Sequence, residues 1–244
     1  MKIKYFLIIF ILLFYLSQLT AFEKSVVIAS TEYPPHTSIH YRNYGYRTDV
    51  VIQAFQEMGY QVEIRLYPWA RALKFAKDGD VDGVIALHTK KREQWFEYSQ
   101  GLATQSIGFY KHKKENISLK NYSDFKFYKI GYVRGYAIPS KLENLNLQIT
   151  WLNKEEQALR MLSQKRLNLA LMEKSVAQYI INKKYPKLDE SIEWIEPSIE
   201  ETIIYLAFSK KTKNYKRKLK DFNIGMARLK KLKKIKEIHE YHKK

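Results

Sequence analysis

Short apolar runs alternate with amphipathic segments along the first part of the chain. Runs at residues 24–30, 61–67 and 81–87 have the length and composition of strands in a sheet. Segments at residues 50–58 and 69–77 carry apolar residues at helical spacing. Strand, helix, strand, helix and strand in about 65 residues predict a parallel, doubly wound α/β unit.

Polar residues and glycines mark the ends of these elements. Pro68 has no amide hydrogen and therefore ends the second strand. Thr48 or Asp49 is expected to cap the helix that begins at Val50. Gly79 is expected to end the next helix in a left-handed conformation.

The same alternation recurs in the middle of the chain and predicts a second α/β unit. Its strands are expected at residues 106–111, 128–133, 148–152 and 167–172, and its helices at residues 138–145, 154–165 (capped by Asn153) and 175–182 (capped by Ser175). A further apolar strand, at residues 202–208, leads into a basic amphipathic helix from about residue 222.

The two units resemble each other in sequence. Residues 72–87 (ALKFAKDGDVDGVIAL) align without gaps with residues 158–173 (ALRMLSQKRLNLALME), and apolar and polar positions follow in nearly the same order. Chance similarity between two βαβ units is the alternative explanation. If the repeat is real, Leu87 to Arg92 and Glu173 lie at equivalent strand ends, one on each lobe. Ligands bind beyond the carboxyl ends of such strands, so a cation and an anion would face each other across a cleft.

These elements predict two α/β lobes joined by a two-strand hinge. The chain is expected to leave the first lobe near Tyr110 and to return near Tyr205. Lobe 1 would then comprise residues 22–110 with 205–244, and lobe 2 residues 111–204.

The N-terminal residues predict export. Lys2 and Lys4 precede an apolar stretch at residues 5–16, and small or polar residues follow as far as Ala21. This pattern is typical of a secretory signal peptide, residues 1–21, that is cleaved to release a periplasmic protein. An uncleaved membrane anchor is the alternative, although the apolar stretch is short for a membrane span.

Composition excludes several classes of chemistry. The chain has no cysteine, which rules out disulfides, thiol catalysis and lipid attachment through cysteine. The histidine pairs at residues 36 and 40 and at 239 and 242 lack the further ligands of a metal site, so neither a metal nor another cofactor is expected. No paired nucleophile and base is recognisable.

The formal net charge of +18 has a local origin. From Lys213 onward, 13 Lys or Arg residues accompany only three acidic ones. Because they fall on an amphipathic helix, we interpret them as its solvated face. Weak attraction to an anionic membrane surface is the alternative, and no nucleic-acid partner is expected.

A series of short motifs runs through the mature chain. They are Tyr33-Pro34-Pro35, Gly45 to Asp49, Gly79 to Gly83, Thr89 to Arg92 shortly before Phe96 to Ser99, Val133-Arg134-Gly135, and Phe222-Asn223. In this order and spacing they resemble the family 3 periplasmic solute-binding proteins of ABC importers, which capture polar amino acids and related solutes. The resemblance implies a periplasmic binding protein type II-like fold, whose lobes close over a ligand.

The resemblance also implies roles for individual residues. Arg92 would clamp a ligand carboxylate, Glu173 would hold its amino group, and rings at Tyr33 and Trp69 would flank it. The full set of expected ligand-binding residues is Tyr33, Trp69, Leu87, Thr89, Arg92, Gly135, Tyr136 and Glu173.

Ordinary structural roles stand beside these assignments. Arg92 could pair with Glu93 or Glu97 at a surface helix, and Thr89 could simply cap that helix. Glu173 could pair with Lys174 or Arg134, and the rings could pack in the core.

Three departures from the family pattern widen the range of ligands. Leu87 stands where a Ser or Thr is common, Glu173 is longer than the usual Asp, and Tyr136 replaces a small hydroxyl residue. A standard α-amino acid is therefore one candidate among several polar solutes.

The sequence favours a non-catalytic, monomeric periplasmic receptor that delivers a small polar solute to an inner-membrane ABC permease. A sensor that presents its ligand-bound form to a membrane signalling protein is one alternative. A cyclohexadienyl-dehydratase-like enzyme on the same fold, with Glu173 as proton donor, is another; that role requires a raised pKa at Glu173.

Overall fold

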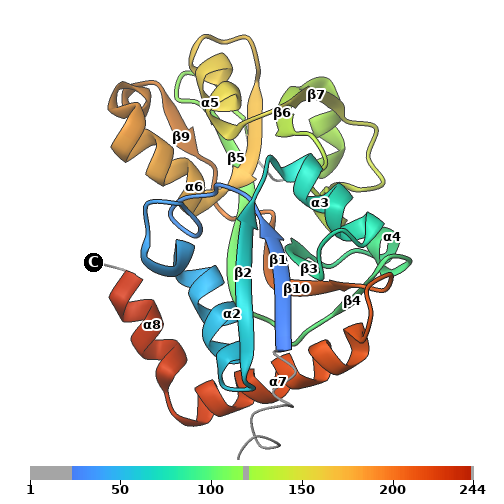
Figure 1. Cartoon of the computed structure of the whole chain (residues 1–244). Helices are drawn as coiled ribbons and strands as arrows, with labels where there is room; N and C mark the ends of the chain where they lie inside the picture. The colour runs from blue at the N-terminus through green and yellow to red at the C-terminus, as the bar shows by residue number, and fades with distance from the viewer. Residues whose placement is uncertain (1–23, 118–120, 243–244) are drawn as a thin grey trace, which may run out of the picture.

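The computed structural model describes residues 24–117 and 121–242, so the predicted signal peptide at residues 1–21 lies outside it. Two α/β lobes are joined by two long strands, β5 (Ala103–His112) and β10 (Glu200–Ser209) (Figure 1). This is the two-lobed fold predicted from the sequence. Within the described ranges, no helix is long and apolar enough to cross a membrane.

The first lobe is built on a sheet with the strand order β2-β1-β3-β10. Strand β1 is parallel to β2 and β3, and β10 runs antiparallel to β3. The elements are β1 (Lys24–Ser30), a 3-10 turn (Arg42–Tyr44), α2 (Tyr46–Gln56), β2 (Tyr60–Leu66), α3 (Trp69–Asp78), β3 (Gly83–Leu87), α4 (Lys90–Glu93), β4 (Phe96–Tyr98), α7 (Tyr215–Lys231) and α8 (Lys234–His242). Helices α2 and α7 pack on one face of this sheet and α3 packs on the other.

The second lobe continues the same sheet through β8, β6 and β7. Strand β6 is parallel to β7 and β8, and β8 runs antiparallel to β5. The regular elements are β6 (Lys129–Val133), β7 (Gln148–Leu152), α5 (Glu155–Ser163), β8 (Leu169–Glu173), α6 (Lys174–Tyr179) and β9 (Ile192–Trp194). Shorter 3-10 and π turns lie at Tyr122–Phe127, Ser140–Leu142, Ile180–Lys184 and Pro186–Glu190.

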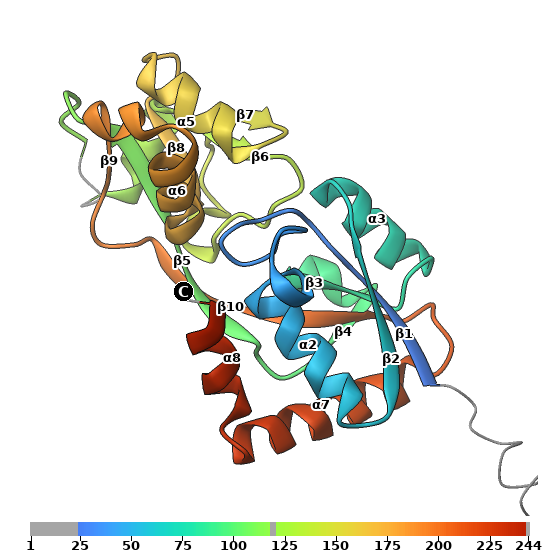
Figure 2. The same cartoon turned by 60° about the vertical axis from the view of Figure 1, so that its left-hand side comes forward.

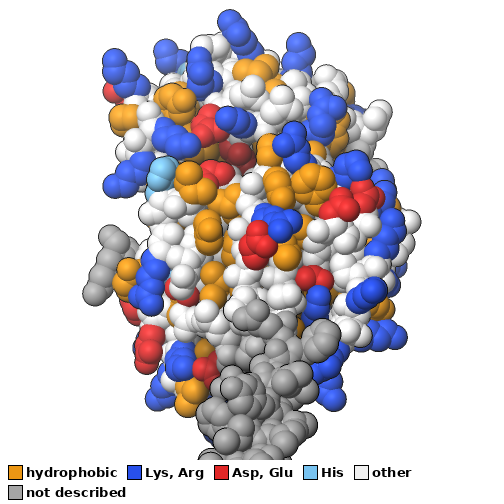
Figure 3. Space-filling view, viewed as in Figure 1, with side chains coloured by type: hydrophobic (Ala, Val, Ile, Leu, Met, Phe, Trp, Pro, Cys, Tyr) orange, Lys and Arg blue, Asp and Glu red, His pale blue; other side chains and the backbone are white. Residues whose placement is uncertain are grey.

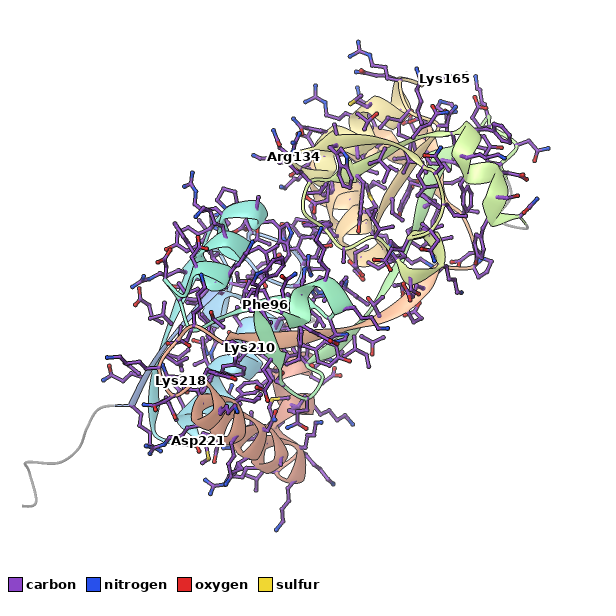
Figure 4. All side chains as sticks on the ribbon, turned by 90° about the vertical axis from the view of Figure 1, so that its right-hand side faces the viewer. Phe96, Arg134, Lys165, Lys210, Lys218 and Asp221 are labelled. Atoms are coloured by element: carbon purple, nitrogen blue, oxygen red, sulfur yellow. The ribbon has the colours of Figure 1, made fainter. Side chains whose placement is uncertain are left out.

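The two connecting strands pair with each other before they part. Residues 103–107 of β5 lie antiparallel to residues 200–204 of β10. Beyond this pairing β5 joins β8 in the second lobe, while β10 joins β3 in the first. Figures 2 and 4 show both strands running between the lobes, with Phe96 in one lobe and Lys165 on the other. The lobe boundaries near Tyr110 and Tyr205 stay a prediction.

The two similar sequence segments have the same structure in the two lobes. Helix α3 and strand β3 occupy residues 69–78 and 83–87, and α5 and β8 occupy residues 155–163 and 169–173. The helices begin 86 positions apart, as do the strands. Leu87 and Glu173 therefore end equivalent strands, as the alignment predicts.

Helix α2 begins one turn earlier than the sequence pattern suggested. Its N-cap is Gly45, whose φ is +104°. Any residue with a side chain would be strained in this conformation. The hydroxyl of Thr48 does not cap the helix, because it donates to the carbonyl oxygen of Gly45. As a result Arg47, expected in a turn, lies in the first turn of the helix and is buried.

Other element ends also differ from expectation. The segment at residues 138–145 contains only the 3-10 turn at Ser140–Leu142, and α5 begins after Lys154 instead of Asn153. Helix α7 begins at Tyr215, ahead of the predicted start near residue 222. A break at Lys233, whose φ is +59°, then separates α7 from α8.

The basic residues of α7 lie on its outer face. Leu219, Phe222, Met226 and Leu229 are buried against the first lobe, while Lys and Arg between these positions are mostly exposed. Lys218 bonds to Asp82 across the lobe, and Figure 4 labels it on α7. Figure 3 shows basic side chains spread over both lobes on the face seen in Figure 1. This burial pattern places the charge run on an exposed helix face, and its role beyond that stays a prediction.

Close packing of α7 against α2 predicts a strict size limit at Gly225. A Cβ atom there would lie 1.9 Å from the carbonyl oxygen of Ala54. We expect Gly225→Ala to reduce the free energy of unfolding by about 1 to 3 kcal/mol, because rigid backbone must move. Ile224→Ala, at an exposed position on the same helix, should change it little. Thermal unfolding of both variants tests this, and equal stability would contradict the described helix contact.

Candidate ligand-binding site

A cavity of about 70 Å³ lies between the lobes, where the carboxyl ends of β1, β3, β6 and β8 converge. Its volume is several times the roughly 15 Å³ that one water molecule needs, so it can hold part of a small solute. The first lobe contributes Ser30, Thr31, Tyr33, Thr37, Arg47, Trp69, Ile85, Ala86, Leu87 and Arg92 to its walls, and the second lobe contributes Tyr132, Tyr136, Ala137, Met172 and Glu173. The paired hinge strands contribute Gln105, Ile107 and Ile204.

Arg92 reaches from the first lobe to the backbone of the second. Its Nη1 donates to the carbonyl oxygen of Leu87 at 2.9 Å, which fixes the side chain beside the end of β3. Its Nη2 donates to the carbonyl oxygen of Gly135 in the second lobe at 3.0 Å. Burial lowers the pKa of this guanidinium from its ordinary value. Thr89 holds Arg92 in place, because its hydroxyl caps α4 by accepting from the Arg92 amide.

Trp69 makes the second contact to the same carbonyl group. Its Nε1 donates to the Gly135 oxygen at 2.8 Å, and the Arg92 guanidinium lies 5.4 Å from its ring centre. Gly135 has a φ of +81°, and a Cβ atom on it would lie 3.4 Å from the Trp69 ring. A glycine here both adopts the left-handed conformation and lets the indole approach closely.

Aromatic rings from both lobes line the cavity wall. Tyr136 of the second lobe makes edge contacts with Trp69 at 5.7 Å and with Tyr33 at 6.1 Å between ring centres. Its hydroxyl donates to Glu155 at the start of α5, at 2.5 Å. Burial raises the pKa of Tyr33, Tyr132 and Tyr136 above the ordinary value, so all three phenols are neutral at pH 7.

Glu173 is buried at the end of β8, with an exposed fraction of 2%. It is the N-cap of α6, where its Oε2 accepts from the Val176 amide at 2.7 Å, so the predicted cap at Ser175 is wrong. The same oxygen lies 3.2 Å from Nε2 of His36 in the first lobe. Burial alone would raise the pKa of Glu173, but the bonds from His36 and from helix amides outweigh it and lower the pKa.

Arg47 is a wall residue that the sequence analysis did not select. Its exposed fraction is 4%, and its Nη2 donates to Oε1 of Gln105 at 2.8 Å. Its Nε is buried and has no hydrogen-bond partner. Spacing carries a signal for it, because Arg47 lies at helical spacing from four of the five buried apolar residues of α2, three, four, seven and eight positions before them.

The structure brings most of the sequence-selected residues together. Tyr33, Trp69, Leu87, Arg92, Tyr136 and Glu173 line the cavity. Gly135 takes part through its carbonyl oxygen, while Thr89 lies outside the lining and serves as a helix cap. Arg134 and Lys174 do not pair with Glu173: Arg134 is exposed on the second lobe (Figure 4), and Lys174 bonds to Glu196. Direct ligand contact by any of these residues stays a prediction.

The sequence analysis missed residues that act through tertiary contacts. His36 lies 137 positions from Glu173, and Gln105 lies 58 positions from Arg47, so each pair meets only in the fold. Tyr132 likewise reaches the cavity only in the fold. Within residues 24–117 and 121–242, no cluster of three His, Asp or Glu side chains is arranged to hold a metal ion.

Comparison with protein families gives one match that spans nearly the whole chain. The sequence profile of the bacterial extracellular solute-binding proteins, family 3, matches residues 26–243. It is the family that the sequence motifs resemble. No curated protein matches the sequence.

Solved structures with the same fold include receptors of more than one kind. A histidine kinase sensor domain with similarity to periplasmic binding proteins has a TM-score of 0.78 at 19% identity, and the match covers 90% of this chain and 96% of that one. An arginine 3rd transport system periplasmic binding protein from Legionella pneumophila has a TM-score of 0.73 at 19% identity, and the match covers 90% of this chain and 100% of that protein. An ancestral arginine-binding protein has a TM-score of 0.74 at 17% identity, and the match covers 90% of this chain and 98% of that protein. At these identities the likeness shows the fold.

The burial of His36 beside Arg47 predicts a pH-dependent stability. Burial, and then the nearby Arg47, lower the pKa of His36 below its ordinary 6.5, although Glu173 opposes this shift. The unfolded chain therefore takes up a proton more readily than the folded protein. The contribution of His36 to the free energy of unfolding is fully present above pH 6.5 and is lost as the pH falls toward the lowered pKa of the folded protein.

We expect the melting temperature of the wild type to fall more than that of His36→Gln between pH 7.5 and 5.5. His40→Gln, at an exposed position in the same loop, should follow the wild type. Parallel curves for the wild type and His36→Gln in differential scanning fluorimetry would contradict the assignment.

Proposed function

Because the chain belongs to family 3 of the bacterial extracellular solute-binding proteins, we propose that it is a periplasmic receptor for an ABC importer. It captures a small polar solute, an amino acid or a related carboxylate, between its lobes and delivers it to an inner-membrane permease. The observation that carries the proposal is a cavity walled by both lobes, with buried Arg92 from one and buried Glu173 from the other.

Binding energy in this site comes from a few strong contacts. Two N–H groups of Arg92 are used by backbone carbonyls, and its other donors can bond a ligand carboxylate. Each charge-assisted bond is worth about 1.5 to 3 kcal/mol when water is excluded. With stacking on Trp69 and Tyr33, two or three such contacts reach the roughly −8 kcal/mol of a micromolar site.

Closure of the lobes links binding to delivery. The bonds of Arg92 and Trp69 to Gly135 and the contact of His36 with Glu173 all join one lobe to the other. A solute that touches both lobes adds its own contacts to this set and so favours the closed form. The permease would then distinguish loaded from empty receptor by the angle between the lobes.

The remaining features of the proposal rest on the sequence. Residues 1–21 would direct export and be removed, and the mature chain would act as a monomer in the periplasm. The lobes would comprise residues 22–110 with 205–244, and residues 111–204.

A sensing role is the second candidate, and one observation favours it. A histidine kinase sensor domain has the same fold over 90% of this chain. In that role the closed form would contact a membrane signalling protein. Permease and ATPase genes beside the coding gene would support import, and their absence with a neighbouring signalling gene would support sensing.

The state of Glu173 argues against a dehydratase-like enzyme. A proton donor must be protonated near neutral pH, which requires a raised pKa. The pKa of Glu173 is lowered instead, because donors from His36 and from helix α6 outweigh its burial. Turnover of prephenate by the purified protein, lost in Glu173→Gln, would overturn the receptor proposal.

The first test is to identify the solute and then to remove its clamp. Native mass spectrometry of the purified protein should reveal a bound small molecule, which calorimetry can then titrate into unloaded protein. We expect Arg92→Ala to weaken its binding about ten- to hundredfold, because a charge-assisted contact is lost. Lys91→Ala, at the exposed neighbouring position, is the control and should bind as the wild type does. Undiminished affinity in Arg92→Ala would remove that residue from the site.

A further inference from the structure

Arg47 is an unpaired buried cation in the cavity wall. Its side chain is almost fully enclosed, and among the described residues its guanidinium donates only to neutral Gln105, while its Nε has no hydrogen-bond partner. The guanidinium also lies 5.8 Å from the centre of the neutral Tyr33 ring. No carboxylate of the described chain lies within ion-pair distance of it. A buried charge without a counter-charge is costly to a fold, and Arg is retained in such places where it recognises an anion.

Helix α2 holds this guanidinium in a fixed position. Arg47 lies in the first turn of the helix, directly after the close approach of Gly45 to His36, where a Cβ would lie 2.6 Å from the His36 oxygen. The bond to Gln105, on hinge strand β5, fixes the far end of the side chain. The guanidinium, which lines the cavity, is therefore held in place by two rigid elements of the first lobe.

The charges around the cavity do not balance. Its lining contains two arginines, Arg47 and Arg92, and one carboxylate, Glu173. Glu173 already accepts from the Val176 amide and from His36, so it does not need a ligand ammonium group to satisfy it. The lining tyrosines are neutral because burial raises their pKa values. The wall thus carries one more positive charge than negative charge.

We propose that Arg47 binds an acidic group of the solute through its guanidinium, and that the solute carries a net negative charge. The inference rests on the receptor function proposed above and narrows its ligand to small organic acids with more acidic than basic groups, such as dicarboxylates. Arg92, which joins the lobes through Gly135, supplies the second positive charge beside such a ligand. Neutral zwitterions and cationic amino acids leave the excess positive charge of the wall uncompensated.

Two substitutions test the role of Arg47 in different ways. Arg47→Gln removes the charge and the Nε donor together. Gln105→Glu keeps the arginine and replaces the amide that it contacts with a carboxylate of nearly the same shape. This carboxylate compensates the charge of Arg47 without a ligand. Arg71→Gln, at an exposed position on α3, is the matched control.

The experiment is a calorimetric titration of the full mature protein with dicarboxylates, zwitterionic amino acids and arginine, at low and physiological salt. We expect the wild type to bind a dicarboxylate, and both Arg47→Gln and Gln105→Glu to weaken this binding about ten- to hundredfold. Arg71→Gln should bind as the wild type does. Gln105→Glu should also melt no lower than the wild type, which separates loss of binding from loss of folding.

The outcomes separate this inference from the proposed function. Tight binding of a zwitterionic or cationic solute that Gln105→Glu leaves unchanged would overturn the inference, while the receptor function would stand. Binding of no solute from any class, together with no small molecule in native mass spectrometry, would overturn both.

Discussion

The pairing of β5 with β10 is the constraint on which the rest of the molecule depends. These two strands tie the lobes together, because they pair with each other at the hinge, and beyond it β5 pairs with β8 of the second lobe and β10 with β3 of the first. The carboxyl ends of β3 and β8 are thereby held opposite each other. Side chains of both lobes that line the cavity are positioned relative to this short antiparallel ladder, and so we expect a bend at a few hinge residues to open or close the site.

The buried charges at the cleft differ in how they are satisfied. Arg92 and Glu173 use backbone groups, a pair of carbonyls and a helix amide, to offset the loss of water. These bonds also tie the two charges to the positions of loops and helix ends. Arg47 has only neutral neighbours, Gln105 and the Tyr33 ring, and its Nε has no hydrogen-bond partner. In a binding protein, charges satisfied by the fold maintain the shape of the site, whereas an unsatisfied one is available to select what enters.

Sequence patterns predict the position of an element when its apolar residues are strongly periodic or when a proline or glycine marks its end. Strands β1 and β7 and helix α3 lie where apolar runs, Pro68 and Gly79 predict them, and the internal similarity correctly placed Leu87 and Glu173 at equivalent strand ends. The start of α2 was predicted too late because Thr48 and Asp49 look like caps. In the fold, that role falls to Gly45, whose left-handed backbone turns the chain into the helix. This single error kept Arg47 off the buried face of α2.

Other site features depend on contacts between distant parts of the chain. His36 approaches Glu173 across 137 positions, and Gln105 meets Arg47 across 58. No local pattern encodes such pairs, since each member alone reads as an ordinary polar residue. A charged residue on an otherwise apolar helical stripe is the one local signal that was available for Arg47.

The repeated helix and strand give the cleft two walls with the same secondary structure but different side chains. Trp69 and Glu155 begin equivalent helices, and both reach the turn at Gly135 and Tyr136, one with an indole and the other with a carboxylate. Leu87 and Glu173 end equivalent strands, one apolar and the other acidic. A symmetric shell with symmetric walls would hold an elongated guest equally well in either direction. Here the partner positions carry different side chains, so the two walls of the cavity differ, and we expect a bound solute to be held in one orientation.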